Sequence, residues 1–196
     1  MNTPVKTPIN KDEIISRLRF AERRLSELLN LNNGELSGAN AQERLQLVQE
    51  FFFHLVGATE VLAQLVNEVR GLGIDSEQVE VYGVANTLPA TDPIKAPLDS
   101  LYTRTRRQPL PADPYSDEGY MFRILNYRNQ VTHRHRNPFQ FVIHLPVGAK
   151  TSPAQAYLLL DSRDPTIGAS NKTAQDELHY MLTLIKTRCE KILSVL

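Results

Sequence analysis

The chain has 196 residues, of which 41% are hydrophobic and 22% charged, and its 22 Lys and Arg balance its 22 Asp and Glu. This composition is typical of a globular domain and excludes a globally disordered chain. Because the net charge is zero, attraction to a charged partner has to come from a local patch. The single cysteine, Cys189, excludes an intrachain disulfide and fits a reducing cytoplasm. Its place in an apolar helical pattern predicts a buried side chain.

Two long amphipathic helices are predicted in the first half of the chain. Residues 1–10 hold two prolines and are expected to be a flexible tail without the apolar core of a signal peptide. Apolar side chains then recur at three- and four-residue steps over 11–31 and again over 41–70. The apolar run 51–66 is interrupted by a histidine and a glutamate and is too short to cross a bilayer. We therefore interpret it as part of a core helix.

The middle of the chain, residues 74–115, contains six prolines and is predicted to be an irregular connection with one short helix near 96–105. A connection this long is uncommon in a compact domain unless it is functional or mobile. The third main helix is predicted to begin after Ser116, because a serine oxygen can cap the first amides and two acidic residues follow. It is predicted to end before Pro138, which cannot continue a helix.

The last third of the chain predicts two short strands and a final helix. Residues 139–145 and 156–161 have strand character and are joined by a segment with a glycine and two prolines, which predicts a β-hairpin. The final helix is predicted over 172–196, with Ser170 or Asn171 as its N-cap.

The predicted fold class is therefore mainly α: a four-helix bundle with a β-hairpin inserted between the third and fourth main helices. Residues 11–196 are expected to form a single domain. Within that domain the hairpin occupies 139–161 and the irregular connection occupies 74–115. The sequence has no internal repeat and no low-complexity tract.

One window of the chain is strongly basic although the whole chain is neutral. Between Gly119 and Leu160 there is no Asp or Glu, but there are four arginines, one lysine and three histidines. Such asymmetry fits an anionic partner, and RNA or a nucleotide phosphate is the first candidate. The alternative is that acids elsewhere in the fold pair with these arginines.

A short motif lies near the predicted end of the third main helix. Arg128 is followed by Asn129, and His133 comes after a gap of four residues. This arrangement resembles the signature of the HEPN superfamily, in which an Arg, usually followed by a polar residue, precedes a His by a similar gap. The family fold is a four-helix bundle with the motif late in its third core helix, where this sequence also places it. The hairpin resembles one subgroup of uncharacterised bacterial HEPN proteins.

Many HEPN members are metal-independent endoribonucleases, so the resemblance implies this activity, in a toxin or an antiphage effector. It implies that His133 transfers protons, that Arg128 clamps phosphate and that Asn129 orients one of them or the substrate. These residue types suit the chemistry, because histidine exchanges protons near neutral pH and arginine grips phosphate oxygens in a fork. The product would carry a cyclic phosphate end, and no cofactor would be needed.

The spacing of the motif places a constraint on a single chain. Five residues of an ideal helix rotate by roughly 140°, so Arg128 and His133 do not lie on one face. HEPN members bring two motifs together across a two-fold axis, so the resemblance implies a homodimer. A toxin would add an antitoxin protein as a partner, and no membrane partner is expected.

Five further residues near the motif are candidate substrate-binding residues: Arg123, Tyr127, Arg134, His135 and Arg136. Tyr127 could stack on a base, with core packing as the alternative. The residues that follow His133 could instead form a solvated turn. No metal site is predicted, because His133 and His135 are two residues apart with no carboxylate nearby in the sequence.

Each motif residue also has a structural alternative. Arg128 could form an ion pair with Glu50 or Glu60 on the second helix, and His133 could favour the negative end of the helix dipole. Two other functions therefore stay open. One is a catalytically inactive HEPN-like module that binds RNA, nucleotide or a protein partner. The other is a helical scaffold whose basic window faces acids on the first two helices.

Overall fold

The computed structural model describes residues 10–32, 38–101, 110–133, 139–144, 154–160 and 172–196. Six helices and two strands lie in these ranges: α1 Lys11–Asn32, α2 Gly38–Val69, α3 Val81–Thr87, α4 Lys95–Asp99, α5 Asp117–His133, β1 Phe139–His144, β2 Ala154–Leu159 and α6 Ala174–Leu193. The predicted mainly helical fold class is confirmed. The expected tail falls almost wholly outside the described residues.

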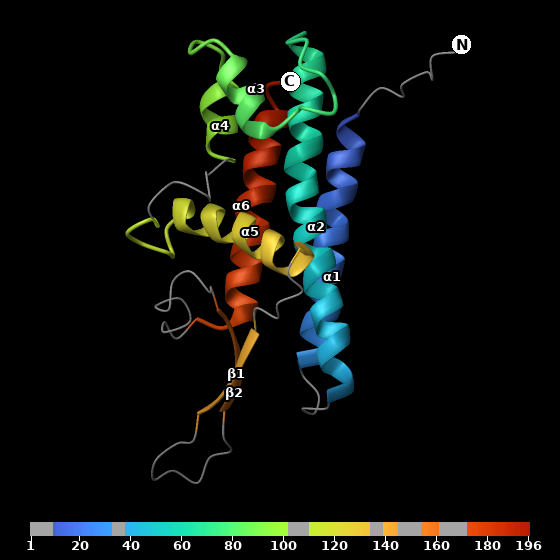
Figure 1. The fold of residues 1–196 in the computed structure, drawn as a ribbon, viewed down its shortest axis with the longest axis vertical. Coiled ribbons are helices and arrows are strands. Elements are labelled where there is room, and N and C mark those ends of the chain that lie inside the picture. Colours follow the sequence, from blue (N-terminus) through green and yellow to red (C-terminus); the bar gives the residue numbers. More distant parts are fainter. Residues whose placement is uncertain (1–9, 33–37, 102–109, 134–138, 145–153, 161–171) are drawn as a thin grey trace, which may run out of the picture.

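Helices α1, α2 and α6 run along the long axis of the molecule, and α1 and α2 pack side by side in opposite directions (Figure 1). Their apolar stripes meet in one core, to which each contributes side chains that are at most 1% exposed: Leu25, Phe51, Leu62, Met181 and Ile185. Each such burial contributes about 1.5–3 kcal/mol relative to exposure, so this contact is a main source of stability.

Helix α5 lies across this group instead of running alongside it, and it packs on α2 and α6 (Figure 1). The sequence of α5 gives the reason, because Tyr120, Met121, Phe122 and Ile124 are all at most 1% exposed although they point in different directions around the helix. A helix that is apolar on most sides needs cover on most sides. In the crossing position, α2 and α6 bury the apolar side chains of α5.

The start of α5 confirms the predicted cap, since the backbone N–H of Gly119 donates to Ser116 Oγ at 3.1 Å. Gly119 also lets the backbone of residues 113–114 approach the helix closely. A Cβ at this position would lie 2.4 Å from the Asp113 carbonyl oxygen and 2.6 Å from the Pro114 carbonyl carbon. The missing side chain therefore lets the 113–114 backbone lie against the first turn of α5.

The N-cap of α6 is Thr173, so the predicted caps Ser170 and Asn171 were wrong. The backbone N–H of Asp176 donates to Thr173 Oγ1 at 3.2 Å, and the backbone N–H of Thr173 donates to Asp176 Oδ2 at 3.3 Å. This reciprocal capping box satisfies two amide donors at once. A single upstream Ser or Asn cannot do this, which explains why the helix begins later than predicted.

The proline-rich connection contains more regular structure than the sequence predicted. Helix α2 ends before Gly71 and Gly73, whose φ angles of 60° and 69° fit the left-handed region that glycine favours. Helix α3 follows, although the sequence predicted no helix there. The short helix predicted near 96–105 corresponds to α4, which ends earlier, at Asp99, while residues 102–105 lie outside the described residues. Leu98, Leu101 and Val84 are at most 2% exposed, so this connection packs onto the core.

Strands β1 and β2 pair in antiparallel register from Phe139 opposite Leu159 to His144 opposite Ala154. They extend from the end of the molecule opposite α3 and α4 (Figure 1). Leu159 is fully buried and joins the hairpin to the main core. Within the described residues, no helix has an apolar stretch long enough to span a membrane.

Candidate functional site

Arg128 and Asn129 lie together on the surface of α5. The side chain of Arg128 is 30% exposed, and its Nη1 donates to Asn129 Oδ1 at 3.3 Å. Its Nη2 lies 3.5 Å from Glu60 Oε1 on α2. Of the two acidic partners suggested for Arg128 by the sequence, Glu60 is therefore confirmed. Glu50 instead pairs with Arg24 of α1 at 2.6 Å.

These two motif residues are exposed or partly exposed on a helix that is mostly buried after its first two residues. From Gly119 to Val131 every side chain is buried except those of Leu125, Arg128 and Asn129. The exposed stripe of α5 therefore ends on the first two residues of the motif, so a ligand approaching this part of the helix from solvent meets a guanidinium and an amide.

His133 is the last residue of α5, so the same helix carries both ends of the motif. The structure does not describe the position of its side chain, and Arg134, His135 and Arg136 lie outside the described residues. The separation of roughly 140° expected on an ideal helix applies to Arg128 and His133, because the helix is continuous between them.

Arg123 and Tyr127 are buried in the core, with exposures of 1% and 0%. Arg123 Nη1 lies 2.7 Å from Glu177 Oε1 on α6, and Arg123 Nη2 donates to the Tyr127 hydroxyl at 3.2 Å. The expectation that these two residues contact substrate is corrected by this burial, because a ligand on the surface cannot reach them. For Tyr127, core packing is therefore confirmed in place of stacking on a base.

Aromatic rings surround the Arg123 guanidinium, whose central carbon lies 5.1 Å from the ring centroid of Tyr120 and 5.2 Å from that of Tyr115. Burial by itself lowers the pKa of Arg123, but Tyr127 and Glu177 beside it raise that pKa above its ordinary value. Burial also raises the pKa of Tyr120 to about 12. Arg123 therefore stays charged inside the fold and holds α5 to α6.

Burial raises the pKa of the Glu177 carboxyl above its ordinary value, and the adjacent Arg123 opposes this shift. The carboxyl is 1% exposed, so it exchanges its contacts with water for the contact with Arg123. The basic window is therefore partly neutralised by an acid of α6, more than fifty residues away in the sequence. No local pattern indicated this partner.

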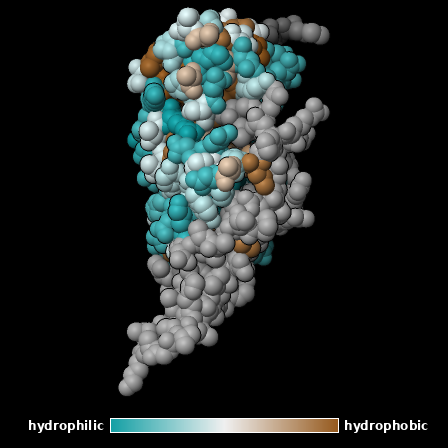
Figure 2. All heavy atoms as spheres, turned by 90° about the vertical axis from the view of Figure 1, so that its left-hand side faces the viewer, coloured by the Kyte–Doolittle hydropathy of each residue, from teal (hydrophilic) through white to brown (hydrophobic). Residues whose placement is uncertain are grey.

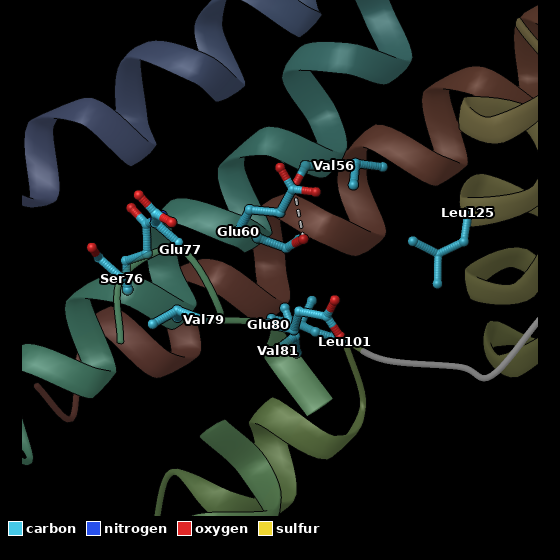
Figure 3. Close-up of a pocket in the computed structure, with 11 residues that line it drawn as sticks. Val56, Glu60, Ser76, Glu77, Val79, Glu80, Val81, Leu101 and Leu125 are labelled. Atoms are coloured by element: carbon cyan, nitrogen blue, oxygen red, sulfur yellow. Dashed lines mark hydrogen bonds between the residues drawn. The ribbon is translucent and has the colours of Figure 1, made fainter. Parts of the chain in front are cut away.

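Beside the Arg128–Glu60 pair lies a pocket of about 280 Å³ that sequence reasoning did not predict. It lies between α2, the start of α3 and one side of α5 (Figure 3). Its lining residues are Val56, Thr59, Glu60, Gln64, Ser76, Glu77, Val79, Glu80, Val81, Leu101 and Leu125. Glu77, Val79 and Glu80 come from the connection predicted to be irregular, so no periodic pattern indicated that they face α2.

The described residues contain no group of three or more His, Cys, Asp or Glu arranged to hold a metal ion. Figure 2 shows one side of the molecule, on which the described surface is mostly hydrophilic and the hydrophobic residues form small separate groups. A scan against protein-family models, a search of curated proteins and a search of solved structures each found no match.

Proposed function

We propose that this chain is a metal-independent endoribonuclease of HEPN type, in which Arg128, Asn129 and His133 act on a phosphodiester. One observation carries the proposal. On a helix whose other side chains over residues 119–131, except that of Leu125, are buried, the guanidinium of Arg128 and the amide of Asn129 reach solvent together and are hydrogen-bonded to each other at 3.3 Å. The biological form that suits this activity is a toxin or an antiphage effector, with an antitoxin as partner.

The chemistry divides between the motif residues. His133 takes the proton of a ribose 2′-hydroxyl, and the 2′-oxygen attacks the adjacent phosphorus. The bond from phosphorus to the 5′-oxygen of the next nucleotide breaks, and that oxygen takes up a proton from water. Arg128 holds the phosphate oxygens in a fork and neutralises the charge that develops on them. Asn129 holds the guanidinium in position through the hydrogen bond described above. The products are a 2′,3′-cyclic phosphate and a free 5′-hydroxyl.

A phosphate has to replace Glu60 as the partner of Arg128. The contact measures 3.5 Å, and both side chains are partly exposed, at 30% and 51%. Pairs of this kind contribute about 0.2–1 kcal/mol, whereas hydrogen bonds to charged groups contribute about 1.5–3 kcal/mol. The exchange of carboxylate for phosphate is therefore favourable when the phosphate is gripped by two N–H groups.

The site requires two subunits, because Arg128 and His133 of one helix point in directions roughly 140° apart. A two-fold axis near the end of α5 would bring Arg128 of one protomer towards His133 of its partner. Sedimentation equilibrium checks this part of the proposal. A protein that stays monomeric at the concentrations at which it cleaves RNA contradicts it.

The main experiment incubates the protein with mixed RNA in EDTA and compares the wild type with His133→Ala. Loss of a general acid or base should lower the cleavage rate by about 10²–10⁴-fold. His179→Ala is the matched control, because His179 is an exposed histidine of α6 outside the motif. Cleavage that survives His133→Ala, or that disappears equally with His179→Ala, would overturn the proposal.

A second candidate function is a catalytically inactive HEPN-like module that binds RNA, nucleotide or a protein partner. The pairing of Arg128 with Glu60 favours it, because a neutralised arginine is a weaker phosphate clamp. This candidate predicts RNA retention without cleavage and a steep loss of binding with added salt. Retention that does not respond to salt points instead to a helical scaffold.

A further inference from the structure

The pocket beside Glu60 has an apolar wall and a polar mouth. Val56, Val81 and Leu101 are at most 7% exposed, so they form a closed floor from α2, α3 and the chain after α4. Its volume of about 280 Å³ lies just below the range of ligand pockets, which typically enclose about 300–1,000 Å³. The space suits a small molecule and is too small to enclose a nucleotide.

The charged groups that line the pocket are all acidic. Glu60, Glu77 and Glu80 line it, and no Lys or Arg does. Among the described residues, the side chains of Glu77 and Glu80 have no hydrogen-bond or ion-pair partner, and Glu80 makes no side-chain cap to α3. Figure 3 shows these carboxylates on the segment that leads into α3, across from Glu60.

The pocket lining also includes a buried hydroxyl. Thr59 is 4% exposed and lines the pocket, and its Oγ1 donates its hydrogen to the Val56 carbonyl at 2.8 Å. The oxygen is left with lone pairs that accept, and no donor among the described residues uses them. Three carboxylates and this hydroxyl therefore present acceptors, which match a ligand that only donates.

We infer that this pocket binds a small organic cation, an ammonium carried on a short aliphatic chain. The ammonium N–H groups would donate to Glu60, Glu77 and Glu80, while the chain lies against the apolar floor. Phosphates and other anions are repelled by the three carboxylates. The aliphatic chain contributes affinity as well, because it buries the apolar wall of the pocket, which a fully polar cation would leave exposed to water.

The position of Glu60 links the pocket to the motif, and this step rests on the proposed function. Glu60 is shared between the pocket and Arg128. A cation in the pocket offers Glu60 another partner, which frees the guanidinium of Arg128 for phosphate. By thermodynamic reciprocity, phosphate bound at Arg128 also strengthens binding of the cation. The cation is thus a positive regulator of the phosphodiester site.

Calorimetric titration with 1,4-diaminobutane, in the absence of RNA, tests the pocket. The wild type should bind it saturably, and the uncharged analogue 1,4-butanediol should bind far less. The double variant Glu77→Gln, Glu80→Gln should lose about fivefold to tenfold in affinity. Glu68→Gln removes an exposed acid outside the pocket and should leave the affinity unchanged. Equal binding of the two ligands, or equal losses in the double variant and Glu68→Gln, would overturn the inference.

A second titration tests the coupling with an RNA oligonucleotide that carries 2′-O-methyl groups and cannot be cleaved. At constant ionic strength, 1,4-diaminobutane should increase its affinity for the wild type by about fivefold. Glu60→Gln should bind tightly without the cation and respond little to it. An unchanged affinity in the wild type overturns the coupling. If Arg128→Ala binds the oligonucleotide as the wild type does, the proposed function fails, while calorimetry still decides on the pocket.

Discussion

Helix α5 carries two arginines, five residues apart, that form ion pairs of opposite character. The Arg123–Glu177 pair is 2.7 Å long, and both side chains are 1% exposed. The Arg128–Glu60 pair is 3.5 Å long, with side chains that are 30% and 51% exposed. The first holds two helices together inside the core, whereas the second is partly exposed to water and can exchange its partner.

The difference shows how burial sets the cost of separating two ion pairs that have the same type of cation. An exposed pair contributes about 0.2–1 kcal/mol, because water solvates both groups when they part. Breaking a buried pair costs about 3–5 kcal/mol, because the remaining charge has no solvent. Arg128 can therefore exchange its partner at little cost and Arg123 cannot, although both belong to the same basic window.

The largest effect is expected for Glu177→Gln, which keeps the volume of the side chain but leaves the Arg123 charge buried without a counter-charge. The free energy of unfolding should fall by about 3–5 kcal/mol. Urea denaturation measures it. Replacing both partners, with Arg123→Met and Glu177→Leu, should recover most of the loss, because no buried charge remains. If the single variant loses less than about 1 kcal/mol, the Arg123–Glu177 pair contributes no more to stability than the exposed Arg128–Glu60 pair, which would contradict the prediction.

The next effect is expected for Gly119→Ala, which tests how the buried pair is held at the start of α5. The added Cβ would meet the backbone at Asp113 and Pro114, and Arg123 Nη1 donates to the Pro114 carbonyl at 3.4 Å. Overpacking of this kind costs about 1–3 kcal/mol. Gly83→Ala is the matched control, since a Cβ there meets nothing within 4 Å. Equal stabilities of the two variants would contradict the close approach.

A smaller effect concerns pH and the rings around Arg123. Burial raises the folded-state pKa of Tyr120 from 10.0 to about 12, so its contribution to stability is full below pH 10 and is lost as pH rises through 12. Between pH 9 and 11 this loss amounts to about 1 kcal/mol. Tyr120→Phe should flatten the fall of the unfolding free energy over that range, as followed by circular dichroism. An unchanged slope would show that another group causes the alkaline loss.

The smallest effect on stability is expected for Glu60→Gln, which should change the free energy of unfolding by less than about 1 kcal/mol. Its effect on binding should be larger, because the variant removes both a competitor for Arg128 and a negative charge beside it. Filter binding of single-stranded RNA at moderate salt should show tighter retention than the wild type. Weaker retention would mean that Glu60 positions Arg128 for binding.

The helices show how far the sequence alone could go. The three- and four-residue periodicity predicted α1 and α2 to within three residues at each end, since each helix buries a single apolar stripe. The Ser116 cap was found for the same reason, because a cap is a local interaction. The α3 helix was missed, because only seven residues form it and burial against α2 supports it.

The site residues also divide into those that a local pattern indicated and those that only the fold brought together. The motif Arg128, Asn129 and His133 was visible in the sequence because its members are close in the chain, and Glu60 was among the partners considered. The burial of Arg123 was not visible, because it depends on Glu177 and on the crossing of α5 over α6. The acidic pocket was also missed, since its lining comes from α2, α5 and the segments around α3 and α4.

The sequence by itself determined the main helices, the basic window and the local motif, because periodicity, charge and caps act over a few residues. Only the tertiary structure decided which arginine is enclosed and which is exposed, and which carboxylates gather around the pocket. The physical reason is that desolvation depends on what packs against a side chain. Segments far apart in the sequence provide that packing, and no short pattern records it.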